Sequence, residues 1–204
     1  MTLSTKPLFG AIILAAGQSK RFGSNKLVAK IGGEPLIKRT IAPFQALPCD
    51  VLVVVTGAYA EELKEVLSPL GVRTTHNLKF ASSGMAISVK CGLDALGSSL
   101  PQLDGLFLHP GDIPLINLDD LEAMVSALLT GESDVLIPTH RGRKGHPLLV
   151  GKSAIVGLAN ISDERLGLRG FLDDYQDRLG YVDLPNEGVL RDVDYRNDLG
   201  QLAV

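Results

Sequence analysis

The stretch Ile12–Lys26, IILAAGQSKRFGSNK, decides how the rest of this sequence is interpreted. Its first three residues are bulky and apolar, as in a strand that is buried on both faces of a sheet. The apolar run stops at two alanines and Gly17, where small side chains would let a ligand lie against the backbone. The loop that follows carries a hydroxyl and three cations, at Ser19, Lys20, Arg21 and Lys26. The stretch therefore predicts a buried strand that leads into a phosphate-binding loop.

Two better-known phosphate loops do not fit this stretch. It contains no GxxxxGK[ST], so it is not a Walker A loop, and it contains no GxGxxG dinucleotide fingerprint. On the pattern alone, a strand followed by a solvated basic turn stays open as the alternative.

Length and composition favour a single domain that acts on a small molecule. The chain has 204 residues, of which 45% are hydrophobic, enough for one α/β domain over residues 1–204. A formal charge of -3 without a basic tail argues against nucleic-acid or membrane-surface partners. No stretch approaches ~18 consecutive apolar residues, and the first ten residues lack a secretory signal core. Cys49 and Cys91 are too few for a disulfide framework, which favours reduced thiols in a cytoplasmic protein.

Apolar runs and helical spacing alternate along most of the chain. Strands are expected at residues 12–14, 51–55, 73–75, 105–108, 134–137 and 148–150, and helices at 36–47, 61–70, 85–96 and 118–129. A looser region predicts a substrate-facing hairpin after Thr139, then a helix at 168–175, strands at 178–184 and 188–193, and a short capped helix at the end. The alternation predicts an α/β fold with a single doubly wound, mostly parallel, Rossmann-like sheet and helices on both faces.

Several polar or small residues follow directly after predicted strands. They are the loop 15–26, Thr56, Asn77 and the pair Gly111–Asp112. Ligands of open parallel sheets bind at the carboxyl ends of the strands, so one edge of the sheet should gather these residues.

Asp112 is the best candidate for a metal ligand. It stands in GDIP after a predicted strand, where Gly111 permits a tight turn and a proline stiffens the exit. Mg²⁺ takes one or two protein carboxylates together with phosphate oxygens, so a second carboxylate is expected, at Asp192 or Asp194 in DVD. The alternatives are a turn residue for Asp112 and helix capping for the later pair.

The loop also fits the pattern LAAGxSxRxGxxK, with matches at Leu14, Ala15, Ala16, Gly17, Ser19, Arg21, Gly23 and Lys26. In this the chain resembles the MobA/MocA-like nucleotidyltransferases, and most closely their molybdenum cofactor cytidylyltransferase branch. The resemblance implies that the loop wraps a nucleoside triphosphate and that Arg21 and Lys26 hold its phosphates. It also implies that Asp112 and Asp192 line an Mg²⁺ site.

A second motif of the family lies in the middle of the chain. Its pattern NxxxxxxGMxxSxxxG is matched by Asn77, Gly84, Met85, Ser88 and Gly92. The resemblance implies that this segment closes over the base and ribose of the nucleotide. The alternative is an ordinary loop, with Gly84 at a helix entry and Ser88 as a solvated surface hydroxyl.

The later half of the chain resembles the acceptor-binding part of the family. GRKGHPLLV is similar to a GRxGHPxL motif that borders the acceptor, which makes His146 a binding candidate. Gly167 and Arg169 resemble a GxR that follows, although Arg165 replaces the aspartate usual two residues before that glycine. The nucleotide-binding part would span about residues 8–115 and the acceptor-binding part about 116–204.

The resemblance implies transfer of a cytidylyl group from CTP to the phosphate of molybdopterin or the molybdenum cofactor, with release of pyrophosphate. A phosphate nucleophile is already ionised at neutral pH, so no general base is needed, and Arg21, Lys26 and Asp112 would be catalytic. A molybdenum hydroxylase would be the partner. Guanylyl or sugar-phosphate transfer is the alternative, although the methyl of Ala16 favours a pyrimidine over the LAGG of the guanylyl branch. A noncatalytic cofactor carrier for a hydroxylase is the second alternative.

Overall fold

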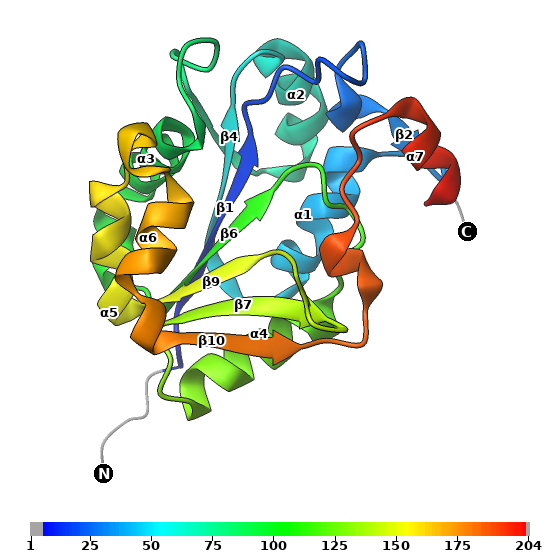
Figure 1. Cartoon of the computed structure of the whole chain (residues 1–204). Coiled ribbons are helices and arrows are strands. Elements are labelled where there is room, and N and C mark those ends of the chain that lie inside the picture. The colour runs from blue at the N-terminus through cyan, green and yellow to red at the C-terminus, as the bar shows by residue number, and fades with distance from the viewer. Residues whose placement is uncertain (1–5, 203–204) are drawn as a thin grey trace.

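The computed structural model describes residues 6–202, and a mixed eight-stranded sheet forms its centre (Figure 1). The sheet order is β10-β7-β9-β6-β1-β4-β5, and β8 pairs with β7. The strands are β1 (Phe9–Ala15), β4 (Cys49–Thr56), β5 (Arg73–His76), β6 (Gly105–Pro110), β7 (Val135–His140), β8 (Arg143–Lys144), β9 (Leu148–Gly151) and β10 (Leu179–Asp183). A separate small ladder joins β2 (Lys30–Ile31) to β3 (Glu34–Pro35).

The strand order reverses at β1, as expected for a doubly wound sheet. Strand β1 lies parallel to β4 on one side and to β6 on the other, so that Leu14 is paired with both Val55 and Pro110. Strands β8 and β9 are the exceptions to the parallel arrangement, because β8 runs antiparallel to β7 and β9 runs antiparallel to both of its neighbours, β6 and β7. The carboxyl ends of β1, β4, β5 and β6 therefore share one edge, which is the edge where ligands of such sheets bind.

Helices cover both faces of the sheet, as the sequence predicts (Figure 1). They are α1 (Leu36–Ala46), α2 (Ala60–Leu67), α3 (Met85–Leu96), α4 (Leu118–Thr130), α5 (Lys152–Ile155), α6 (Leu168–Asp174) and α7 (Arg196–Gln201). Ile13 packs in a core cluster with α1, α2 and α4, whereas Ile12 packs in a second cluster with α3, α5 and α6. Both side chains are fully buried, because successive residues of a strand point to opposite faces.

One part of the later half differs from the expectation. The strand predicted at 188–193 is wrong, because Glu187–Leu190 forms a 3-10 helix and residues 191–193 belong to no helix or strand. Gly188 lies so close to the backbone of Leu115 that an added Cβ would collide with it. The hairpin expected after Thr139 is present as β7 and β8, and the strand expected at 148–150 lies within β9, which inserts into the sheet between β6 and β7. Within residues 6–202, no helix is long and apolar enough to cross a membrane.

Candidate active site

The loop after β1 folds into a defined turn. Ser19 has a positive φ of 48°, and its carbonyl accepts hydrogen bonds from the N–H groups of Phe22 and Gly23 at 3.0 and 3.1 Å. Phe22 is only 3% exposed, so it anchors the middle of the loop in the core. The Asn25 side chain accepts from Leu27 N at 3.1 Å and begins the 3-10 helix that carries Lys26. The sequence Ser19–Lys26 thus holds its last cation in a fixed place.

Lys26 joins two carboxylates from distant parts of the chain. Its Nζ lies 2.6 Å from Asp112 Oδ2 and 3.2 Å from Asp194 Oδ1, and its side chain is only 12% exposed. Arg21 forms a second ion pair with Asp194. Burial alone would raise the pKa of Asp194, but Lys26 and then Arg21 outweigh burial and hold the pKa of this carboxyl below its usual range. We call these four residues the Lys26 cluster.

Backbone hydrogen bonds fix Asp112 beside the C-terminal segment. Gly111 N donates to Leu14 O at 2.8 Å, which ties the GDIP turn to the end of β1. Val193 N donates to Asp112 O at 3.0 Å, and Val193 itself is fully buried. The two aspartates that flank Val193 are therefore delivered to the same place as Asp112, with Asp192 exposed and Asp194 half-buried.

The carboxylates fit a metal that arrives with phosphate. Within the described residues, no group of three or more His, Cys, Asp or Glu side chains is arranged to hold a metal ion. Mg²⁺ in nucleotide sites needs only one or two carboxylates, because phosphate oxygens and water complete its octahedron. Asp112 and Asp192 offer such a pair. Lys26 neutralises Asp112 in the structure.

A cavity of about 300 Å³ lies at the carboxyl ends of β1 and β6. We call it the first cavity, and its lining residues are Leu14, Ala16, Gly17, Phe80, Ser83, Gly84, Met85, Ser88, Pro110 and Asp112. The structure thus brings two predicted motifs and Asp112 around one space. Ala15 is 3% exposed and belongs to the core beneath this space.

Asn77 orders the wall of the first cavity from behind. It is 1% exposed, its Nδ2 donates to Ser88 Oγ at 3.0 Å, and its Oδ1 accepts from Lys79 N at 2.9 Å. Ser88 is therefore a buried hydroxyl, and the alternative of a solvated surface group is wrong. Gly92 has a packing role, because an added Cβ there would meet Ile12 at 2.6 Å.

Sequence reasoning missed Asp163, which holds the start of α3. Its carboxylate accepts hydrogen bonds from Gly84 N at 2.8 Å and from Ala86 N at 3.3 Å. An added Cβ at Gly84 would collide with this carboxylate, so the glycine is needed there. The signal in the sequence that could have identified Asp163 is its place four residues before Gly167. The motif of the family has its aspartate two residues before that glycine. Arg165, at the expected position, pairs with Asp174 at 2.9 Å.

The two predicted acceptor residues lie in different surroundings. His146 N donates to Val189 O at 2.9 Å, and its buried Nδ1 has no hydrogen-bond partner among residues 6–202. Burial lowers the pKa of His146, and the charges of Asp112 and Asp192 oppose that shift only in part, so the imidazole is neutral at pH 7. Arg169 is exposed on α6 and does not line the first cavity.

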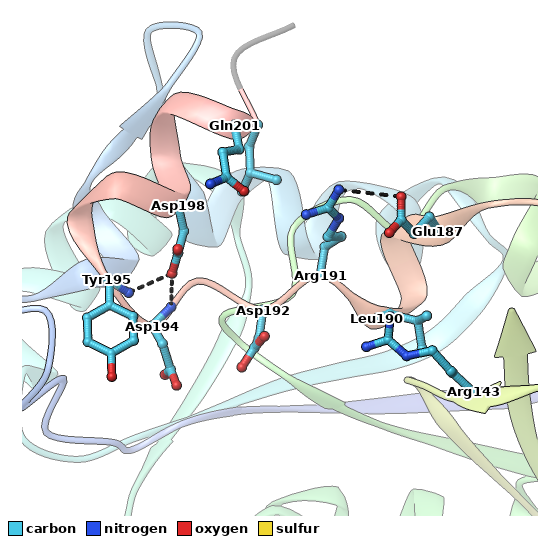
Figure 2. Close-up of a pocket in the computed structure, with 10 residues that line it drawn as sticks. Arg143, Glu187, Leu190, Arg191, Asp192, Asp194, Tyr195, Asp198 and Gln201 are labelled. Carbon is cyan, nitrogen blue, oxygen red and sulfur yellow. Dashed lines mark hydrogen bonds and ion pairs between the residues drawn. The ribbon is translucent and has the colours of Figure 1, made fainter.

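A cavity of about 350 Å³ lies on the side of the C-terminal segment (Figure 2). We call it the second cavity, and its lining residues are Arg143, Glu187, Leu190, Arg191, Asp192, Asp194, Tyr195, Asp198, Gln201 and Leu202. Asp194 belongs both to this lining and to the Lys26 cluster. The cluster therefore lies between the two cavities, with Asp112 facing one and Asp194 the other.

Such an arrangement of loop, cavity and carboxylates suits a nucleotide-handling enzyme, and comparison with known families agrees. Residues 11–179 match the MobA-like NTP transferase domain. The chain belongs to this family. The match includes the loop after β1, the GDIP turn and the first cavity, and it makes this MobA-like protein a nucleotidyltransferase.

Relatives in this family use different acceptors. The protein is 28% identical to the molybdenum cofactor cytidylyltransferase of Escherichia coli K12, over 92% of this chain and 91% of that protein. It is 29% identical to the 2-C-methyl-D-erythritol 4-phosphate cytidylyltransferase of Dehalococcoides mccartyi, over 63% of this chain and 57% of that protein. A Mycobacterium tuberculosis protein whose structure is a complex with manganese shares the fold, with a TM-score of 0.76, 16% identity, and coverage of 97% of this chain and 98% of that one.

Proposed function

We propose that this MobA-like enzyme transfers a cytidylyl group from CTP to the phosphate of a molybdopterin-type acceptor and releases pyrophosphate. The observation that carries the proposal is the Lys26 cluster, in which a buried ammonium bridges Asp112 and Asp194 between two cavities. One cavity would hold the nucleotide and the other would receive the acceptor. The similarity to the Escherichia coli enzyme over nearly the whole chain supports the choice of base and acceptor.

The reaction needs charge and positioning and does not need a general base. A phosphate monoester has a second pKa near ~6, so the nucleophile is already largely ionised at neutral pH. Lys26 and Arg21 would stabilise the negative charge that develops on the transferred phosphorus centre and on pyrophosphate. Mg²⁺, held by Asp112 and Asp192, supplies further charge neutralisation when it is bound with the nucleotide. His146 is neutral and would serve as a hydrogen-bonding residue on the acceptor side.

Nucleotide binding would require an exchange of partners. Lys26 pairs with Asp112, which is one of the two carboxylates proposed to hold the metal, and with Asp194. Triphosphate oxygens would take over Lys26 and Arg21, and the released Asp112 would then face the metal together with Asp192. Metal and nucleotide should therefore bind more tightly together than either binds alone.

Base choice would rest on the wall formed by Ala16. Ala16 lines the first cavity, and its Cβ and carbonyl lie so close to Gly57 that no side chain fits at position 57. Because Ala16 is held in this way, its methyl group cannot easily move away from a larger purine. A methyl group held in this way leaves less room for a purine base, which supports CTP over GTP as the substrate.

A phosphorylated polyol is the second candidate acceptor. The observation in its favour is the similarity to the methylerythritol-phosphate enzyme, which extends over 63% of this chain.

With molybdopterin as acceptor, a molybdenum hydroxylase in the cytoplasm would receive the product.

The decisive experiment pairs each nucleoside triphosphate with each acceptor. Purified protein is incubated with Mg²⁺ and CTP, GTP, ATP or UTP, together with molybdopterin or a polyol phosphate, and pyrophosphate release and product mass are measured. The proposal predicts a cytidylylated pterin. A guanylylated product would change the base, a cytidylylated polyol would change the acceptor, and no pyrophosphate with any pair would favour a noncatalytic carrier.

A further inference from the structure

The second cavity is connected to the first through a single side chain. Asp112 lines the first cavity and Asp194 lines the second, and Lys26 Nζ contacts both carboxylates. A group bound in the second cavity next to Asp194 would therefore lie close to a nucleotide phosphate bound at Lys26. The attacking phosphate group of the acceptor would have to lie at this position.

Most acidic groups of the second cavity are already neutralised or bonded. Glu187 Oε2 lies 3.4 Å from Arg191 Nη2. Asp198 Oδ2 accepts hydrogen bonds from Asp194 N at 2.9 Å and from Tyr195 N at 2.7 Å (Figure 2). Asp194 is held by Lys26 and Arg21. Of the four carboxylates, only Asp192 lacks a hydrogen bond or ion pair within residues 6–202, and Asp192 is the candidate metal ligand.

Of the two arginines that line the second cavity, Arg191 pairs with Glu187, whereas Arg143 pairs with no carboxylate of the described residues. It lies on β8, and no carboxylate oxygen of the described residues comes within 4.0 Å of its guanidinium. In Figure 2 its side chain points toward the side of the cavity where Asp192 lies. Its neighbour Lys144 is different, because its Nζ lies 4.9 Å from the centre of the Tyr181 ring, outside this cavity.

We propose that Arg143 binds the phosphate group of the acceptor and holds it beside Asp192 and the Lys26 cluster. The inference rests on the proposed function, because it assigns the acceptor half of that reaction to a residue. A guanidinium offers two parallel N–H donors, which match two oxygens of a phosphate, and it stays charged at every working pH.

The surroundings of Arg143 also indicate the class of acceptor. A further cavity of about 360 Å³ shares Arg143, Glu187 and Leu190 with the second cavity and adds His140, Arg141 and Pro185. Arg143 thus lies where the second cavity and this further cavity meet. The phosphate of the acceptor would lie in one cavity and the rest of the acceptor in the other. Because charged and polar side chains dominate both cavities, they suit a phosphate monoester with a compact polar body, not one with a long alkyl chain.

The test measures phosphate binding without turnover. Inorganic phosphate is titrated into protein saturated with Mg²⁺ and a non-hydrolysable CTP analogue, and ³¹P line broadening reports the bound fraction. The analogue fills the positions of the nucleotide phosphates, so additional binding reports the acceptor position. Arg143→Ala should weaken this binding by at least about tenfold, as expected for one charge-assisted contact. Lys144→Ala, the matched control, should bind like the wild type, and thermal unfolding verifies that both variants fold.

Equal phosphate affinity in Arg143→Ala and wild type would overturn the inference, as would the absence of phosphate binding in the wild type. A loss of affinity for the CTP analogue, with phosphate affinity unchanged, would also overturn it and would assign Arg143 to the nucleotide phosphates. The proposed function fails separately: it is contradicted if no pyrophosphate is released from CTP, whereas the phosphate titration does not depend on that result.

Discussion

Replacement of Lys26 by alanine tests the central contact of the site. The Lys26 side chain is 12% exposed and its ammonium lies 2.6 and 3.2 Å from two carboxylates, so these neighbours hold it in place. Removing one preorganised donor or charge that acts on a developing oxyanion costs ~3 kcal/mol, and each ~1.4 kcal/mol is a factor of ten in rate. We therefore expect kcat/KM for CTP to fall by about 100-fold or more.

Steady-state pyrophosphate release at varied CTP measures this effect. The control is Lys30→Ala, because Lys30 is an exposed lysine on β2, only four residues further on, and should leave kcat/KM unchanged. A mild rise in KM with an unchanged kcat would refute the reasoning, since Lys26 would then only assist binding. Thermal unfolding gives an independent readout: without Lys26, Asp112 loses its counter-charge, so Mg²⁺ should raise the Tm of the variant more than that of the wild type.

Three further predictions follow from the same geometry. Asp112→Asn should abolish turnover with an unchanged Tm, because a carboxamide keeps the shape but binds Mg²⁺ poorly, and full activity at saturating Mg²⁺ would contradict the metal assignment. Ala16→Gly should shift the ratio of kcat/KM for CTP and GTP toward GTP by ~1 to 3 kcal/mol at most, and an unchanged ratio would mean that Ala16 does not face the base. Burial lowers the pKa of His109 to about 3, so only the unfolded chain binds this proton as the pH falls below ~6.5. The free energy of unfolding should therefore fall by up to ~1.4 kcal/mol per pH unit from this group, and urea titrations should show a shallower pH dependence for His109→Gln.

The sheet could be predicted from sequence because its signals are local. Continuous apolar runs such as Val51–Val55 occur where a strand is buried on both faces, and the structure places this run inside β4. The loops after such strands then gather at one edge by topology alone, which is how Gly17 and Asp112 come to line one cavity. Local patterns do not encode the antiparallel insertion of β9, because its pairing with β6 depends on the neighbours available in space.

The site itself was predictable in its parts but not in its pairings. Asp192 and Asp194 look equivalent in the DVD sequence, and only the fold shows that Asp194 meets a lysine 168 residues away. Asp163 escaped detection because it reaches α3 from a 3-10 turn whose spacing differs by two residues from the expected motif. Long-range contacts made by irregular segments have no periodicity that a sequence can display.

The contacts of the C-terminal segment also set the order in which the enzyme can become active during its own synthesis. Arg196 donates to Ser24 Oγ at 2.9 Å and lies 5.2 Å from the centre of the Phe22 ring. Together with the pairing of Lys26 and Asp194, these contacts attach the last-made part of the described chain to one of its first loops. A growing polypeptide that has already formed β1, β4 and β6 therefore has part of the first cavity but no complete Lys26 cluster. Under the proposed function, catalysis would have to wait until residues 191–202 have been made and have folded back.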